Sequence, residues 1–171
     1  QIDKNTELFK SNFSELDGNV LNWKPNSKSW SIGQVIDHLI RTSEGYFRIP
    51  EMIIDPKFKP SIFSKIKFIP KIIGNLLLKS VDPETKRKVK TMGDFTPELS
   101  KIKENILQDF QNSQIELHNL INDNEDLIKA RKVIPSPLSK HIVYHFDTVI
   151  DILVNHQIRH FNQAKSVYSK Y

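Results

Sequence analysis

Two histidines near the end of the chain have the spacing of a metal-ligand pair. His156 and His160 lie in the stretch 151–165, which reads DILVNHQIRHFNQAK. On a helix, residues i and i+4 share one face, with their Cβ atoms about 5–6 Å apart, so two imidazoles in this arrangement can bind one ion. Burying polar rings without partners costs free energy. Because apolar residues continue the same face, we expect a ligand or a hydrogen-bond partner to satisfy both rings.

The element that must position this pair is a predicted last helix, which follows a loop with two prolines and begins between Lys140 and Asp147. The residues of its buried face recur at helical spacing and are Val149, Leu153, His156, His160, Ala164 and Val167. A third imidazole, His38, belongs to a second predicted helix that starts in the sequence WSIGQ. There Ser31 and Gln34 match a capping box, in which a hydroxyl and an amide satisfy free backbone N–H groups. Three histidine nitrogens that leave one coordination position of the metal open are typical of catalytic zinc sites. Sequence spacing alone, however, does not show that His38 lies near the other two histidines.

Two further helices are predicted from apolar periodicity. One runs from about residue 4 to residue 16, and Gly18 just beyond it would take the left-handed conformation of a helix terminus. The other begins with Thr96 as N-cap of the sequence TPE and continues to about residue 121. Four patterned helices favour an all-α four-helix bundle. Residues 56–81 would then form a crossover excursion between the second and third helices.

Motifs spread over nearly the whole chain resemble those of the DinB-like (YfiT-type) superfamily. They are Leu21, Trp23 and Pro25; Trp30-Ser31-Ile32-Gly33-Gln34 leading to His38-Leu39; and His156-x-x-Arg159-His160-x-x-Gln163. The resemblance implies a single domain over residues 1–171 with a four-helix-bundle fold and a divalent-metal triad of His38, His156 and His160. It also implies metal-dependent chemistry, because characterised relatives include thiol-dependent transferases and isomerases. Homodimers are common in the family.

The composition limits the ligand chemistry. A chain of 171 residues is long enough for one domain with a real core. It contains no cysteine, so histidine and carboxylate are its strong metal ligands, and any thiol must come from a cosubstrate. We expect a cytoplasmic protein, because the lack of cysteine is compatible with a reducing compartment and no apolar run is long enough to span a membrane.

Positive charge is concentrated in residues 57–90. This segment holds ten lysines and arginines against two acids, a balance of +8; because the whole chain carries +5, the remainder carries −3. One interpretation is an amphipathic surface for anionic lipid. The other, which we prefer, is an excursion packed over one end of the bundle with its lysines outward. Nucleic-acid binding is not expected, because mostly aliphatic rather than stacking residues separate the basic ones.

The residues around the histidine pair restrict the mechanism. Gln157 follows His156, whereas zincins carry a glutamate there as general base, and no carboxylate is predicted on the metal-facing side of either helix. Metal-bound water or the thiol of a cosubstrate must then supply the nucleophile. Gln163, one turn beyond His160, could orient a ligand imidazole or remain a surface amide. Arg159 could meet an anionic substrate or form a solvated salt bridge.

For the remaining histidines and both tryptophans we expect structural roles rather than roles in metal binding. We expect His118, His141 and His145 to be surface or loop imidazoles. Trp23 and Trp30 are expected to anchor the loop between the first two helices in the core.

Two functions therefore stay open. The first is a metal-dependent hydrolase or thiol-dependent S-transferase for an unknown small molecule, with zinc or nickel held by His38, His156 and His160. The second is a non-catalytic metal- or ligand-binding bundle associated with stress response.

Overall fold

The structure is a computed structural model that describes residues 1–171 with the exception of 86–90, 92 and 99. In chain order its elements are α1 (Ile2–Phe13), α2 (Gly18–Asn22), α3 (Ile32–Phe47), α4 (Ile49–Ile54), the 3-10 helix η1 (Ile62–Lys65), α5 (Ile69–Val81), the 3-10 helix η2 (Gly93–Phe95), α6 (Ile106–Asn122), α7 (Glu125–Lys129), β1 (Val133–Ser136), β2 (Ser139–His145) and α8 (Phe146–Tyr168). The predicted all-α class is confirmed, and α8 begins within the predicted range.

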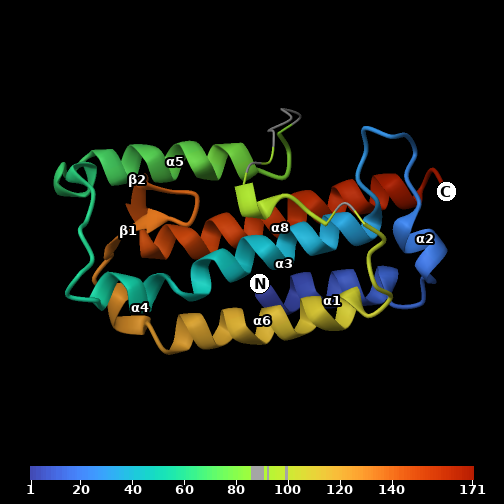
Figure 1. The fold of residues 1–171 in the computed structure, drawn as a ribbon, viewed down its shortest axis with the longest axis horizontal. Coiled ribbons are helices and arrows are strands. Elements are labelled where there is room, and N and C mark those ends of the chain that lie inside the picture. The colour runs from blue at the N-terminus through green and yellow to red at the C-terminus, as the bar shows by residue number, and fades with distance from the viewer. Residues whose placement is uncertain (86–90, 92, 99) are drawn as a thin grey trace.

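The long helices α1, α3, α6 and α8 form the bundle (Figure 1). Helix α3 packs against α6 and α8, and α1 packs against the same two helices. An aromatic cluster joins α1, α6 and α8: the ring of Phe9 lies 4.8 Å from that of Phe110 and 5.4 Å from that of Phe161. All three rings are buried, and removal of such large apolar surfaces from water is the main force that holds the helices together.

A short hairpin precedes α8 and extends the core. Strands β1 and β2 pair antiparallel, with Ile134 opposite Tyr144. The hydroxyl of Tyr144 lies 2.6 Å from that of Tyr46 on α3, inside a second buried cluster. Burial raises the pKa of Tyr144 to about 12, and it raises the pKa of Tyr46 well above its ordinary value. Both hydroxyls therefore stay neutral, and their hydrogen bond ties the hairpin to α3.

The chain leaves the bundle after α3 and returns at α6, as the sequence predicted. Elements α4, η1 and α5 make this excursion, and α5 packs against β2 and α8, beside which it runs in Figure 1. Gly74 permits the close approach, because a Cβ there would lie only 3.2 Å from Cγ2 of Thr148. Within the described residues, no helix combines the length and the apolar character needed to cross a membrane.

Three amide side chains form a polar chain inside the bundle. Asn5 on α1 donates from Nδ2 to Oε1 of Gln157 on α8 at 3.0 Å and to the carbonyl of Val154 at 3.1 Å. Gln157 in turn donates from Nε2 to Oε1 of Gln114 on α6 at 2.9 Å. All three amides are buried, so these hydrogen bonds replace the water that the core excludes. Among the described residues, the buried side-chain atoms without a hydrogen-bond partner are Nε2 of Gln114, Oγ of Ser113 and Nδ1 of His160.

The predicted end of the first helix is wrong. Helix α1 ends at Phe13, and Gly18 does not take a left-handed conformation but begins α2. Asp17 is the N-cap of α2, because its carboxylate accepts the backbone N–H groups of Asn19 and Val20. An aspartate before a glycine can cap the start of a helix, just as a glycine can mark the end of one. Here the pair marks the start of α2 instead of the end of α1.

The predicted helix start at the sequence TPE is also wrong, since α6 begins at Ile106. Side chains from other elements satisfy the backbone of the preceding segment instead. The carboxylate of Asp37 on α3 accepts the N–H of Glu98 at 2.7 Å. The amide of Asn22 accepts the N–H of Ile102 at 2.7 Å and donates to its carbonyl at 3.0 Å. Because these tertiary hydrogen bonds satisfy the backbone of the segment, it does not form the helix that its local sequence favours.

Candidate metal centre

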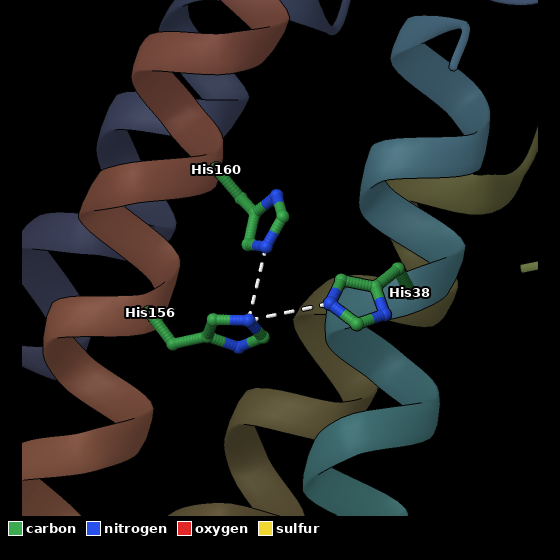
Figure 2. A group of neighbouring side chains, drawn as sticks. All are labelled: His38, His156 and His160. Carbon is green, nitrogen blue, oxygen red and sulfur yellow. Dashed lines mark hydrogen bonds between the residues drawn. The ribbon is translucent and has the colours of Figure 1, made fainter. Parts of the chain in front are cut away.

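The three histidines predicted as metal ligands meet between α3 and α8 (Figure 2). His38 projects from α3, and His156 and His160 project from successive turns of α8. Nε2 of His156 lies 3.2 Å from Nε2 of His38 and 2.9 Å from Nε2 of His160. One nitrogen of each ring thus faces a shared space, and these candidate ligand atoms all lie within 4.8 Å of one another.

The local sequence fixes where His38 stands on α3. The predicted capping box is present, because Oγ of Ser31 accepts the N–H of Gln34 at 3.1 Å and Oε1 of Gln34 accepts the N–H of Ser31 at 3.2 Å. This pair defines the first turn of α3. His38 follows on the inward side of the helix, where only 4% of its surface is exposed.

A backbone carbonyl orients the His38 ring. Nδ1 of His38 donates to the carbonyl of Phe95 in η2 at 2.6 Å, which leaves the lone pair on Nε2. Metal-binding histidines commonly make this kind of hydrogen bond with the nitrogen that does not bind the metal. Gly45 permits the approach of η2, because a Cβ there would lie 2.7 Å from Cε1 of Phe95. Gly45 thus makes room for the residue whose carbonyl orients His38.

Protons alone cannot satisfy this cluster. A neutral imidazole carries one N–H and one lone pair, and the lone pair of His38 faces His156. A proton on Nε2 of His156 can point at only one of its two neighbours. A proton on Nε2 of His160 would instead leave the lone pairs of His38 and His156 facing each other. A cation bound by all three lone pairs would remove this conflict, so the donor set fits a metal ion.

The spacing of the nitrogens supports the same conclusion. Two imidazoles bound to one ion at 2.0–2.1 Å have nitrogens about 2.8–3.0 Å apart at right angles and about 3.3–3.4 Å apart in tetrahedral geometry. The separations of 2.9 and 3.2 Å in this cluster fall within that span. Nε2 of His156 therefore already stands at ligand distance from Nε2 of both His38 and His160.

Burial keeps all three rings in the neutral form that binds metal. It lowers the pKa of His160 to about 3, with the neighbouring His38 as a further cause. It lowers the pKa of His156 well below its ordinary value, and the neighbouring His160 and His38 act in the same direction. The pKa of His38 is lowered by burial as well, against the opposite effect of the Phe95 carbonyl. Protons therefore compete weakly for these nitrogens at neutral pH.

A sequence model described as the DinB superfamily matches residues 1–164 of the chain. The chain belongs to the DinB superfamily. The matched region contains all three histidines, so the sequence resemblance is confirmed over nearly the whole chain. Searches of curated proteins and of solved structures gave no significant match.

One tryptophan of this DinB chain has a role that sequence reasoning missed. The ring of Trp30 lies 4.9 Å from that of His38, and it stacks on His160 at 6.0 Å with an interplanar angle of 20°. Trp30 and Trp23 both pack against the core, as expected, but Trp23 contacts Tyr171 instead of the histidines. The position of Trp30 at the head of the WSIGQ motif, eight residues before His38, was the available signal.

The two residues predicted to support the ligands differ in what they touch. Gln163 lies close enough to His160 to act against the lowering of its pKa. Even so, Nδ1 of His160 is buried without a hydrogen-bond partner of good geometry among the described residues. Nη1 of Arg159 donates to the carbonyls of Asp82 and Thr85 at 3.2 and 3.3 Å, so it links α8 to the segment after α5. Its positive charge helps to lower the pKa of His160.

The other histidines of this DinB chain lie outside the cluster, as predicted. His118 binds Asp3 at 2.8 Å on the surface, and Nδ1 of His141 lies 3.4 Å from Oγ of Ser61. His145 donates from Nδ1 to the carbonyl of Arg131 at 2.8 Å, just before α8 begins. None of the three belongs to the metal-competent group that the described residues contain.

The carboxylate nearest in sequence to a candidate ligand, that of Asp37, binds other groups. Asp37 precedes His38, but its Oδ2 accepts from Nε of Arg41 at 2.8 Å and from the N–H of Glu98 at 2.7 Å. It therefore fixes the segment before α6 to α3. Among the described residues, the metal-competent group consists of histidines without a carboxylate.

Proposed function

We propose that this protein is a metal-dependent enzyme in which His38, His156 and His160 hold a divalent ion. The observation that carries the proposal is that Nε2 of His156 lies at ligand distance from Nε2 of both His38 and His160, with the candidate ligand atoms of all three rings within 4.8 Å of one another. The reaction would be hydrolysis of a small molecule or transfer to the thiol of a low-molecular-weight cosubstrate. Membership of the DinB superfamily supports the proposal, because the resemblance to this family implies metal-dependent chemistry.

Three nitrogen ligands suit zinc or nickel. Imidazole is a common ligand of both, and neither needs the thiolate that this chain lacks. When bound, such an ion would act as a Lewis acid toward water or a thiol. The choice between the two metals would follow from availability as much as from affinity.

The chain's own residues would prepare and protect the site. Burial keeps the imidazoles neutral, and the carbonyl of Phe95 holds His38 with its Nε2 lone pair directed at the other two rings. The indole of Trp30 covers one side of His38 and His160, which limits the access of bulk water from that side. His156 is the most exposed of the three ligands, so we propose that substrates approach past it.

Measurement of bound metal tests the site first. Tag-free protein would be reconstituted with zinc or nickel, passed over a desalting column and analysed for metal. We expect about one ion per chain, and His156→Ala should lose it. His118→Ala is the matched control, because it removes a histidine on the surface that contacts only Asp3 in the described contacts. Equal metal content in both variants would refute the triad.

Catalysis requires a second measurement on the metal-loaded protein. Thiol cosubstrates and hydrolysable esters, amides and lactones would be screened for turnover, with the metal-free parent and metal-treated His156→Ala as blanks. Turnover that needs both the ion and His156 would support an enzyme. Full metal loading without any turnover would favour the second candidate, a non-catalytic metal-binding bundle. The completeness of the three-histidine set without any carboxylate beside it is compatible with that candidate too.

A further inference from the structure

The outward side of the excursion is unusually apolar. Four large side chains of η1, of α5 and of its N-cap residue Phe68 are more than half exposed: Ile62 at 70%, Phe68 at 63%, Ile72 at 51% and Leu76 at 61%. Isolated exposed apolar residues are ordinary, but a group of them on one element indicates a surface that meets a partner. The interpretation that we preferred from sequence was an excursion packed on the bundle with its lysines outward. The structure shows exposed lysines, and these four apolar side chains are exposed with them.

These side chains form one stripe. Phe68, Ile72 and Leu76 follow one another at intervals of four residues, so they lie on a single side of α5 over about 12 Å. Element η1, which carries Ile62, contacts α5 directly. We call the outward side of η1 and α5, with these four residues, the α5 face.

Packing of α5 on the protein does not account for the α5 face. The opposite side of the helix already covers the core through Ile73 and Leu77 and approaches Thr148 through Gly74. Helix α5 is thus apolar on both sides. A helix that only covered the bundle would need one apolar side.

The charges beside the α5 face select the partner. Between Lys57 and Val81 the sequence has six lysines and neither aspartate nor glutamate. Lys65, Lys71 and Lys79 are exposed on the same two elements. Exposed aliphatic and aromatic side chains surrounded by lysines match the interface of a bilayer with anionic headgroups, into which the apolar groups insert while the ammonium groups remain at the headgroups.

A second copy of the chain fits this face less well. A two-fold contact would place the same surface of both copies together, so the lysines of one copy would face those of the other. An anionic surface offsets these charges instead. We propose that the α5 face docks this protein on an anionic phospholipid bilayer.

Sedimentation with vesicles tests the proposal. The full chain would be mixed with vesicles of phosphatidylcholine and phosphatidylserine at 7:3 or with pure phosphatidylcholine, about 50 mM salt being used so that screening stays weak. We expect binding to the anionic vesicles only. The triple variant Phe68→Ser/Ile72→Ser/Leu76→Ser should bind at least tenfold more weakly. Its matched control, Leu8→Ser/Ile115→Ser, removes exposed apolar side chains from α1 and α6 and should bind like the parent.

The lysines provide an independent test. Each lysine near an anionic surface contributes about a fivefold increase in partitioning, so Lys65→Gln/Lys71→Gln/Lys79→Gln should weaken binding by about a hundredfold. The control Lys10→Gln/Lys101→Gln makes charge changes at exposed positions far from α5 and should weaken it little.

Three results would overturn the proposal. The first is no binding of the parent to anionic vesicles at low salt. The second is equal binding of the α5-face variants and their controls. The third is a dimer, seen by light scattering, that the apolar triple variant abolishes while vesicles bind neither protein. Thermal unfolding of each variant confirms that a loss of binding is not a loss of fold.

Discussion

Gly45→Ala tests how the ligand His38 is held. The new Cβ would lie 2.7 Å from Cε1 of Phe95, whereas ordinary contact begins at 3.4 Å. The Phe95 ring must therefore move, and ordinary contact is restored by a movement of 0.7 Å, the difference between these two distances. Because the carbonyl of the same residue accepts the Nδ1–H of His38 at 2.6 Å, this movement should lengthen or bend the hydrogen bond that orients the ring.

The two expected effects differ in size. Alanine in place of glycine inside a helix adds about 1 kcal/mol of stability, and overpacking removes about 1–3 kcal/mol, so the free energy of unfolding should fall by at most about 2 kcal/mol. Loss of a hydrogen bond behind a metal ligand typically weakens metal binding by about 10- to 100-fold. Because Phe95 can adjust in part, we expect a value near the lower limit, about tenfold.

Competition with a chromophoric chelator measures this change as the dissociation constant for zinc. Gly74→Ala is the matched control, because its Cβ would also crowd a neighbour, Thr148 at 3.2 Å, but on α5; its zinc affinity should equal that of the parent. Phe95→Ala added to Gly45→Ala removes the clashing ring and keeps the carbonyl, so it should restore most of the affinity. A folded Gly45→Ala protein with the parent's zinc affinity would refute the reasoning.

Three further predictions concern pH, fluorescence and the core. Without metal, the protein should lose stability as the pH falls below about 6.5. Burial lowers the pKa of His160 to about 3 in the folded protein, so the unfolded chain takes up the proton first. The urea midpoint of unfolding should therefore fall from pH 7 to 6 to 5, and a midpoint that stays constant would contradict this. Nickel should quench indole fluorescence in the parent and in Trp23→Phe but not in Trp30→Phe, because only Trp30 adjoins the histidines. Tyr46→Phe should cost about 1–3 kcal/mol in urea unfolding, because it removes a buried hydrogen bond to Tyr144; an unchanged midpoint would show that the remaining hydroxyl finds another partner.

The candidate ligands could be chosen from sequence because each has a local signal. The four-residue interval of His156 and His160 fixes them to one side of a helix, and the capping box of Ser31 and Gln34 fixes the start of the helix that carries His38. What periodicity could not supply is the approach of α3 to α8, since it depends on contacts between distant segments. The family resemblance supplied it.

The errors arise where tertiary contacts override local chemistry. The segment before α6 has good helix-start residues, yet Asp37 and Asn22 satisfy its backbone from other elements. The sequence predicted a loop with two prolines where the structure has the hairpin. Pro135 cannot donate a hydrogen bond to a neighbouring strand. A two-stranded sheet tolerates it, since each strand has one unpaired edge. The roles of Phe95 and Trp30 depend on loops whose paths the sequence does not specify.

The buried amide chain has a consequence for the geometry of the cluster. Apolar contacts have no preferred direction, so they specify the axial position of α8 against α1 and α6 less sharply than hydrogen bonds do. A slide by one helical turn, about 5.4 Å, would separate Gln157 from both Asn5 and Gln114 and leave buried amides unpaired, at about 1–3 kcal/mol each. His156 is the residue immediately before Gln157. The amides thus act as an axial lock, which sets the height at which His156 meets His38.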